Sequence, residues 1–260
     1  MPFSQNNGLR FYQFDSLDVR HAVFTRNGGF SPEPWNSLNL GGTVGDEIER
    51  VRKNRYLCFE TMDCKRESIF DVWQVHSADA VCADAPRGMD EPYQRADIIL
   101  TDKPEVTLFM RFADCVPILV HDPKKNIIGM SHAGWLGTVR DVAGATIKTM
   151  QERYGSDPSD VIACIGPSIG PDHYEVGEDV ITQVKQTFGD DSDLVLLSHN
   201  SSTHFDLWKA NQYLLERAGV TQIELAGICT ACHTEDWFSH RAEKGKTGRF
   251  GALISLLSSK

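Results

Sequence analysis

The sequence predicts an α+β fold in which strands and helices are mixed along the chain. Short apolar segments rich in β-branched residues, bounded by charged or proline-containing turns, are typical of strands. They occupy residues 21–25, 96–102, 106–113, 116–122, 126–133, 161–166 and 222–230. Helical periodicity and capping residues predict helices from Asp46 onward and over residues 138–154, 176–189 and 206–219. Because some strands are joined by turns and others by helices, the pattern is closer to α+β than to a regular βαβ series.

The strands at 116–122 and 126–133 are predicted to form an antiparallel hairpin. The segment "DPKKN" at 122–126 reads as a tight turn between them. Such a hairpin brings the start of its first strand close to the end of its second strand. We therefore expect Cys115 and His132 to be neighbours despite their separation in the sequence.

Caps and apolar faces support the predicted helices. Asp46 followed by Glu49 resembles a capping box, and Asp206 is placed to cap the helix over 206–219. The helix over 138–154 has one apolar face, and Gly155 suits its C-terminal cap. That face consists of Val139, Val142, Ala143, Thr146, Ile147, Met150 and Tyr154.

The composition is that of a globular protein, and we expect one domain over residues 1–260. With 41% hydrophobic residues the chain has enough apolar side chains for a sizeable core. The net charge of −10 argues against general binding to nucleic acid or to an anionic membrane, because phosphate contacts need a basic face. A small anionic substrate stays possible, since one local pocket can be positive on an acidic protein.

The sequence offers no segment of the kind that directs export or membrane insertion. Its first residues lack a basic start followed by an apolar run, and no apolar stretch approaches the ~20 residues needed to span a bilayer. We therefore expect a cytoplasmic protein. In that compartment the seven cysteines should be mostly free thiols.

His76, Cys115 and His132 are the first candidates for a functional site. Two imidazoles and one thiol suit zinc or copper, and three protein ligands leave a fourth position open, as in catalytic sites. Cys115 and His132 also suit a nucleophile and its base, with Asp114 orienting the histidine. Plain core is the third interpretation, because free cysteines are commonly buried. Spacing alone does not separate these alternatives.

The segment "CTACH" at 229–233 contains a second pair of thiols. The pattern matches covalent haem attachment, which takes place outside the cytoplasm, so we reject that interpretation. Cys229 and Cys232 remain a redox pair, a structural zinc pair or simple thiols at a strand end. No other pair of cysteines in the sequence has the spacing that would complete a zinc site.

Two glycine-containing segments carry positive charge. The loop expected over 238–253 contains Arg241, Arg249 and two lysines, and guanidinium and backbone N–H groups are able to hold phosphate. Its spacing is not that of a Walker P-loop, and a solvated basic loop is the alternative. Arg26 likewise precedes two glycines that would let a ligand approach the backbone.

Several motifs occur in one order from about residue 20 to the C-terminus. They are "FTRNGGFSPEPWNSLNLGGTVGD", "QVHS", "ADCVPILVHD", "SHAGWLGT", "IGPSIGPDHYEVGEDV", "HFDLWKAN", "CT" and "FSHR" followed by "KTGR". Each motif is modest by itself, but their joint order is highly specific. With them the chain resembles the YfiH-like family, also called the laccase-domain or multicopper polyphenol oxidase family.

The resemblance implies a single-domain, layered α/β/β/α fold with mixed sheets, shared with cytotoxic necrotizing factor-like cysteine hydrolases. It implies a metal site at His76, Cys115 and His132, usually for zinc, with copper as the alternative. It also implies phosphorolysis of purine nucleosides, methylthioadenosine included, and deamination of adenosine. The expected partners are purine nucleosides and phosphate, and the expected state is a monomer or a weak homodimer.

The resemblance also suggests roles for individual residues. Catalytic roles are expected for His76, Cys115 and His132, with Asp114 as an acid/base or as an orienting residue. Two positive groups that the family usually has are absent, since Leu136 replaces an arginine and "SHRA" at 239–242 replaces Ser-Tyr-Arg-Arg. Substrate or phosphate binding is then expected from Arg26, Asn39, Arg241 and Arg249.

Two other functions compete with this one. One is a copper-dependent polyphenol oxidase of the laccase type, which the older family name records. A full multicopper oxidase needs many histidine ligands, including His-x-His pairs, and none of the nine histidines forms such a pair. The other is a protein that edits or binds peptidoglycan precursors with weak turnover.

Overall fold

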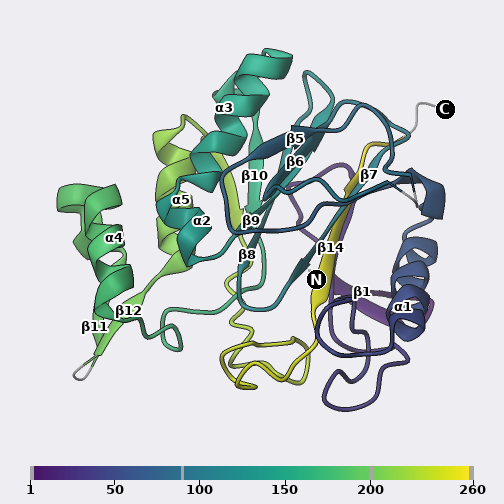
Figure 1. The fold of residues 1–260 in the computed structure, drawn as a ribbon. Helices are drawn as coiled ribbons and strands as arrows, with labels where there is room; N and C mark the ends of the chain where they lie inside the picture. The colour runs from purple at the N-terminus through teal and green to yellow at the C-terminus, as the bar shows by residue number, and fades with distance from the viewer. Residues whose placement is uncertain (1–2, 89–90, 200–201, 258–260) are drawn as a thin grey trace.

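The computed structural model describes residues 3–88, 91–199 and 202–257 of the chain, and most of its strands belong to two six-stranded sheets (Figure 1). In spatial order the first sheet consists of β1 (Phe3–Asn6), β2 (Leu9–Tyr12), β3 (Arg20–Phe24), β14 (Phe250–Ser255), β7 (Thr107–Phe112) and β4 (Ile69–Phe70). The second consists of β13 (Gln222–Leu225), β10 (Ile162–Ile165), β8 (Val116–Asp122), β9 (Ile127–Ala133), β6 (Ile98–Thr101) and β5 (Ala80–Cys82). A small hairpin pairs β11 (Leu196–His199) with β12 (Ser202–Phe205).

The helices lie outside these sheets. They are α1 (Ile48–Thr61), α2 (Trp135–Val139), α3 (Val142–Tyr154), α4 (Glu178–Phe188) and α5 (Leu207–Arg217). Short 3₁₀ turns cover Arg66–Ser68, Pro158–Asp160 and Gly189–Leu194. Among the described residues, none of the helices combines the length and the apolar character that crossing a membrane requires.

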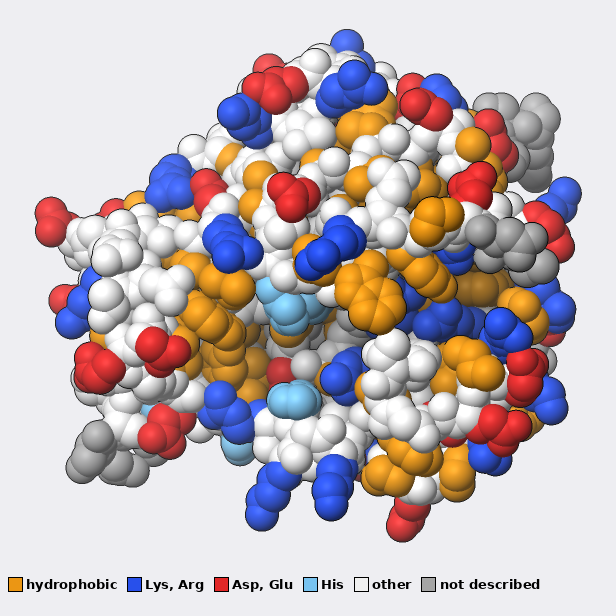
Figure 2. Space-filling view, viewed as in Figure 1, with side chains coloured by type: hydrophobic (Ala, Val, Ile, Leu, Met, Phe, Trp, Pro, Cys, Tyr) orange, Lys and Arg blue, Asp and Glu red, His pale blue; other side chains and the backbone are white. Residues whose placement is uncertain are grey.

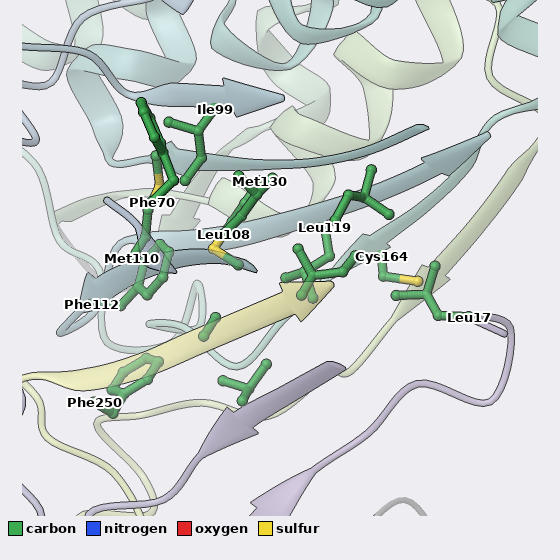
Figure 3. Packing of buried hydrophobic residues seen from close by; sticks show 14 of the residues in the cluster. Leu17, Phe70, Ile99, Leu108, Met110, Phe112, Leu119, Met130, Cys164 and Phe250 are labelled. Carbon is green, nitrogen blue, oxygen red and sulfur yellow. The ribbon is translucent and has the colours of Figure 1, made fainter. Parts of the chain in front are cut away.

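The main core lies between the two large sheets. Leu108 and Met110 of β7 pack there with Met130 of β9 and Leu119 of β8, as Figure 3 shows. Figure 3 also places Phe112 and Phe250, from two neighbouring strands of the first sheet, in this layer. The two sheets therefore bury one face each against the other.

The outer face of each sheet is covered by helices. Val51, Cys58 and Phe59 of α1 share a buried cluster with Phe24 and Phe109 of the first sheet. On the other side, α3 and α5 pack on the second sheet and α4 packs on α2, and the apolar residues of these helices share one cluster with those of β8 and β10. Helix, sheet, sheet and helix thus form four layers, and the expected α+β, layered α/β/β/α fold is confirmed.

Burial on both faces explains why the central strands read as continuous apolar runs. In β8, Leu119 belongs to the core between the sheets, whereas Ile118 and Val120 belong to the cluster beneath the helices. Successive side chains of a strand point to opposite faces, so a strand covered on both sides needs apolar residues at every position. All seven residues of β8 are buried.

The predicted hairpin is present as β8 and β9. Its register pairs Val116 with Ala133 and Pro117 with His132, and the Asp122 carboxylate accepts hydrogen bonds from two backbone N–H groups of the turn. The open end of the hairpin therefore brings Cys115, which directly precedes β8, next to His132 on β9.

Two helix starts differ from the prediction. The helix expected over 138–154 is interrupted, because Asp141 has a left-handed conformation with φ of 59° and caps α3 by accepting a hydrogen bond from the Gly144 N–H. Asp46 does not cap α1, which begins at Ile48 with Glu47 as its N-cap residue. The Asp46 carboxylate instead accepts hydrogen bonds from Ser31 and Asn39 in the preceding loop. The caps expected from Gly155 and Asp206 are confirmed.

Several strands were not predicted, and one was predicted too long. The segment expected to be a basic loop over 238–253 runs into β14, a central strand of the first sheet. Its glycines and charged residues masked the short apolar run that follows. The strand expected over 222–230 ends at Leu225, and the rest is a loop that meets Ser168 in a single bridge at Cys229. The prediction also missed β1, β2, β4, β5, β11 and β12.

Candidate metal centre and its surroundings

His76, Cys115 and His132 come together at the open end of the β8–β9 hairpin. Their ligand atoms, two imidazole nitrogens and one sulfur, all lie within 4.8 Å of one another. Cys115 directly precedes β8, His132 lies on β9, and His76 comes from the loop between β4 and β5. The two imidazole rings are 4.9 Å apart between centroids. Topology therefore assembles the three residues from three separate segments.

Asp97, a fully buried residue just before β6, holds this site in place. One carboxylate oxygen accepts a hydrogen bond from His132 Nδ1 at 2.8 Å. The other accepts from the backbone N–H groups of Val75 and Ser77, which flank His76. Because Nδ1 is used for Asp97, His132 presents Nε2 to a ligand, the arrangement typical of metal-binding histidines.

The electrostatics of the cluster favour charge separation in the metal-free protein. Burial would raise the pKa of the Cys115 thiol, but His132 and His76 outweigh burial and hold that pKa at about 6. Burial likewise opposes protonation of His132, yet the Cys115 thiolate and the Asp97 carboxylate raise its pKa to about 9. A thiolate beside an imidazolium suits either interpretation, a metal ligand or a nucleophile with its base.

Space and donor chemistry both fit a metal at these residues. A Cβ added to Gly134 would lie 2.8 Å from Cys115 Sγ and 3.1 Å from His76 Nδ1, so only glycine leaves room beside the donors. A thiolate with two imidazoles is a ligand set that zinc and copper accept. His76 itself has φ of 59°, and Arg140 Nη1 donates to its carbonyl oxygen at 2.9 Å.

Asp114 is buried next to Cys115, but it holds loops rather than the histidine. Its two carboxylate oxygens accept hydrogen bonds from Thr230 Oγ1 at 2.7 Å and from the Arg241 backbone N–H at 2.6 Å. The orienting role that the sequence suggested for Asp114 belongs to Asp97. The sequence showed Asp97 only as an ordinary aspartate at the start of a strand.

Asn39 and Arg249 are brought together by the fold. Asn39 Oδ1 accepts a hydrogen bond from the Arg249 backbone N–H at 2.9 Å, and its amide nitrogen donates to Asp46. The Arg249 side chain is partly buried and donates to the carbonyl oxygens of Thr247 and Gly248. Burial lowers the pKa of Arg249, whereas the negative charges of Cys115 and Asp114 raise it. Its guanidinium therefore belongs to the surroundings of the Cys115 thiol.

Arg26 lies elsewhere. Its guanidinium forms an ion pair with Glu243 at 3.0 Å and stacks over the Phe238 ring at 4.3 Å. It lines a cavity of about 410 Å³ whose lining includes Glu33 and Glu235 but none of the three candidate metal ligands. The positive charge of Arg26 is thus already balanced inside the protein.

Arg241 and Tyr174 form another part of the rim around the three candidate metal ligands. The exposed Arg241 guanidinium lies 5.0 Å from the centre of the Tyr174 ring and donates to the carbonyl oxygens of His173 and Glu175. Burial raises the pKa of the Tyr174 hydroxyl, and the nearby Cys115 thiolate adds to that increase. Tyr174 was not singled out in the sequence, although it lies within one of the family motifs.

Three arginines around the centre have no acidic partner among the described residues. No carboxylate of the described chain lies within 4.0 Å of a guanidinium nitrogen of Arg140, Arg241 or Arg249. Arg140 follows Leu136 by one helical turn, with its backbone N–H bonded to the Leu136 carbonyl oxygen. A cation thus stands close to the place where the family's usual arginine is missing.

Figure 2 shows a hollow near the middle of the face seen in Figure 1. Histidine side chains lie on two sides of the hollow, and both acidic and basic side chains are visible within it. Hydrophobic side chains line one margin, toward α4. Such a mixture of apolar walls and a few convergent polar groups is typical of a small-molecule site.

Comparisons with known proteins show which proteins this chain is similar to. Residues 20–257 match the family described as multi-copper polyphenol oxidoreductase laccase. A Bacteroides thetaiotaomicron protein named purine nucleoside phosphorylase is 36% identical, with 92% of this chain and 94% of the relative covered. A Deinococcus radiodurans protein of the same name is also 36% identical, with 96% of this chain and 94% of the relative covered.

Solved structures share the whole fold. A Bacillus licheniformis protein called YfiH has a TM-score of 0.92 and 32% identity, over 98% of this chain and 99% of its own. YlmD from Geobacillus stearothermophilus has a TM-score of 0.90 and 33% identity, over 98% of each chain. The likeness therefore extends over nearly the whole chain and all four layers.

Proposed function

We propose that this chain is a purine nucleoside phosphorylase. It belongs to the multi-copper polyphenol oxidoreductase laccase family, and relatives of it are named purine nucleoside phosphorylase. The observation that carries the proposal is the His76, Cys115 and His132 cluster with three arginines around it, none of which has an acidic partner among the described residues. In a chain with a net charge of −10, cations left unpaired at one site favour an anionic substrate.

Phosphate is the anion that we assign to these arginines. Arg249 is the principal candidate, because its guanidinium is partly buried and lies in the surroundings of Cys115. Arg241 and Arg140 add positive charge from two other loops at the rim. Guanidinium groups match phosphate oxygens with parallel, charge-assisted hydrogen bonds, so a partly desolvated arginine both binds and orients the nucleophile.

The three donor residues would hold the metal, with zinc as the expected ion and copper as the alternative. When bound there, a metal supplies a Lewis acid and stabilises developing negative charge. Asp97 keeps His132 in one tautomer and orientation and also holds the loop that carries His76. Cys115 contributes a thiolate near neutral pH, because its pKa lies at about 6.

The remaining residues position the substrate. Cleavage of the N-glycosidic bond leaves negative charge on the purine, so the base has to be protonated or otherwise stabilised as it departs. We assign Asp114 to positioning, since its carboxylate holds Thr230 and the Arg241 backbone at the edge of the site. Asn39 in turn positions Arg249, and Tyr174 offers an apolar ring and a hydroxyl to the nucleoside.

The same site is proposed to act on methylthioadenosine with phosphate and to deaminate adenosine. Deamination needs an activated water rather than phosphate, so the two reactions compete for one substrate at one centre. Adenosine with phosphate should yield adenine and ribose 1-phosphate, whereas adenosine without phosphate should yield inosine. Phosphate dependence therefore separates the two activities.

The test uses the full chain, purified under reducing conditions and analysed for metal content. Inosine, adenosine and methylthioadenosine are each incubated with and without phosphate, and the released base and the ribose 1-phosphate are quantified. We expect phosphate-dependent release of the free base. A metal-replete protein that turns over no purine nucleoside would contradict the proposal, and oxidation of a phenolic substrate in its place would point to a laccase-type activity.

A further inference from the structure

A second cluster of metal-ligating side chains lies outside the centre described above. Asp172 and His173 follow β10, and Cys229 and Cys232 follow β13. These two strands are parallel neighbours, with Ile165 paired to Leu225, so their C-terminal ends deliver both loops to the same edge of the second sheet. The four ligand atoms lie within 4.8 Å of one another.

Four distances in this cluster lie within about 0.3 Å of the edges of a coordination tetrahedron. With the usual zinc–ligand bond lengths, tetrahedral edges measure about 3.6 Å between S and N, about 3.5 Å between S and O and about 3.3 Å between N and O. Cys232 Sγ lies 3.5 Å from His173 Nδ1 and 3.4 Å from Asp172 Oδ2. The remaining two measured edges are Cys229 Sγ to His173 Nδ1 at 3.9 Å and His173 Nδ1 to Asp172 Oδ2 at 3.0 Å.

The backbone around Cys229 is arranged as it is around metal-bound thiolates. The Gly170 N–H donates to Cys229 Sγ at 3.2 Å, and such a bond stabilises negative charge on sulfur. The Cys229 carbonyl oxygen accepts from the His233 N–H, which turns the chain so that Cys232 faces the same point. A Cβ on Gly170 would lie 2.7 Å from an Asp172 carboxylate oxygen and 3.1 Å from Cys229 Cβ, so a side chain there would disturb both ligands.

We propose that Asp172, His173, Cys229 and Cys232 form a second metal site, which binds a thiophilic divalent cation of the zinc type. Four protein ligands close the coordination shell, and a closed shell is typical of structural zinc. On binding, each thiol loses its proton to solvent and coordinates as a thiolate, while His173 coordinates as neutral imidazole through Nδ1. The site involves no change of oxidation state.

The proposed ion would stabilise the wall of the active site. Between the two cysteines lies Thr230, whose hydroxyl donates to Asp114. The carbonyl oxygen of His173 accepts a hydrogen bond from the Arg241 guanidinium, and the Arg241 backbone N–H donates to Asp114 as well. A metal ion that holds His173 against the cysteine loop therefore also holds Thr230 and Arg241, the two hydrogen-bond partners of Asp114, which precedes Cys115 in the sequence.

The experiment counts metal ions per chain in the full-length protein after loading with Zn²⁺ and removal of excess ion. We expect two ions in the wild type and one in Cys232→Ser, whose exposed side chain has little packing to lose. His233→Ala is the matched control, because His233 is exposed, adjoins Cys232 and bonds to Glu235 through its imidazole, while only its backbone N–H bonds to Cys229. It should keep both ions.

A second measurement does not depend on metal binding at His76, Cys115 and His132. In Cys115→Ala loaded with Co²⁺, we expect the thiolate-to-cobalt absorption to come from Cys229 and Cys232, and it should disappear when both are changed to serine. Equal metal content in Cys232→Ser and the wild type would overturn the proposal. A disulfide between Cys229 and Cys232 that persists after reduction and metal loading would overturn it as well. None of these readouts uses turnover, so failure of the proposed phosphorylase activity leaves them interpretable.

Discussion

The two ligand clusters of this protein are built in opposite ways. His76, Cys115 and His132 lie at the end of a buried hairpin, and the fully buried Asp97 fixes the ring of His132. The second cluster lies on two loops at the sheet edge, and three of its four residues are exposed. The first cluster offers three donors and has arginines around it, whereas the second offers four donors and is supported by the Gly170 N–H and by the Arg241 guanidinium, which donates to the His173 carbonyl oxygen.

The difference teaches how the same ligand types acquire different tasks. Three donors leave an open position for a substrate, and four donors close the coordination shell. A buried carboxylate behind the first cluster makes its geometry rigid, which chemistry requires. We infer that the first cluster serves catalysis and the second serves stability, and the following predictions test that division.

The largest expected effect is a difference in activity between variants of Cys115, in the first cluster, and of Cys232, in the second. Cys115→Ala should lower kcat/KM for phosphorolysis by about 10³-fold, because it removes a ligand of the proposed catalytic metal. Cys232→Ser should change kcat/KM by no more than about threefold, since a surface side chain outside the chemistry contributes little to the transition state. Steady-state kinetics with inosine and phosphate provide the measurement. Comparable losses in both variants would mean that the clusters share one task.

The next-largest effect is a loss of metal affinity on changing one of two carboxylates: Asp97, which supports the first cluster, and Asp172, which is a ligand in the second. Asp97→Asn should lower metal affinity at the first centre or the activity by about 10- to 100-fold, as is usual for a carboxylate that supports a metal-binding histidine. Asp172→Asn should lower affinity only at the second site. Competition with a chromogenic chelator measures both affinities. Unchanged affinity and activity in Asp97→Asn would show that the hydrogen bond to His132 has no role in either.

Arg249 should account for a further part of phosphate recognition. Arg249→Gln removes a partly buried cation, and a hydrogen bond to a charged group contributes about 1.5–3 kcal/mol, so the KM for phosphate should rise at least about tenfold. Arg153→Gln is the control, because Arg153 is exposed in the last turn of α3. A KM that is equally unaffected in both variants would assign phosphate to the other arginines.

The smallest effect is a pH dependence of the two thiols in metal-free protein. The pKa of Cys115 is lowered to about 6, so its thiolate persists above that pH and is lost as the pH falls through it. Its alkylation by iodoacetamide should be level above about pH 7 and fall about tenfold between pH 7 and pH 5. Partial desolvation of its sulfur, with the Cys229 thiol and the Asp172 carboxylate nearby, raises the pKa of Cys232 to about 12, so this thiol should react slowly throughout although its side chain is exposed.

Peptide mapping by mass spectrometry measures both alkylation rates in one sample. Metal loading should protect Cys115, and Cys115→Ser identifies its peptide. If Cys232 instead reacts first at pH 7, then exposure rather than charge governs thiol reactivity in this protein, and the contrast between the clusters loses its electrostatic basis.

Much of the fold was accessible from local sequence signals. The hairpin of β8 and β9, the cap at Asp206 and the left-handed Gly155 were predicted, because turn and cap chemistry depends on residues a few positions apart. The strand β14 was missed, since its apolar run is short and follows a charged, glycine-rich loop. The break before α3 was missed because Asp141 adopts a conformation that a helical apolar face does not reveal.

The sequence by itself determined which residues are able to carry chemistry: the candidate ligands His76, Cys115 and His132, and the thiol pair Cys229 and Cys232. Only the tertiary structure decided which other residues they contact. It bonded His132 to Asp97, and it brought the thiol pair to Asp172 and His173. The physical reason is that periodicity and turn chemistry act over a few residues, whereas such contacts depend on which strands lie side by side once both faces of the sheets are buried.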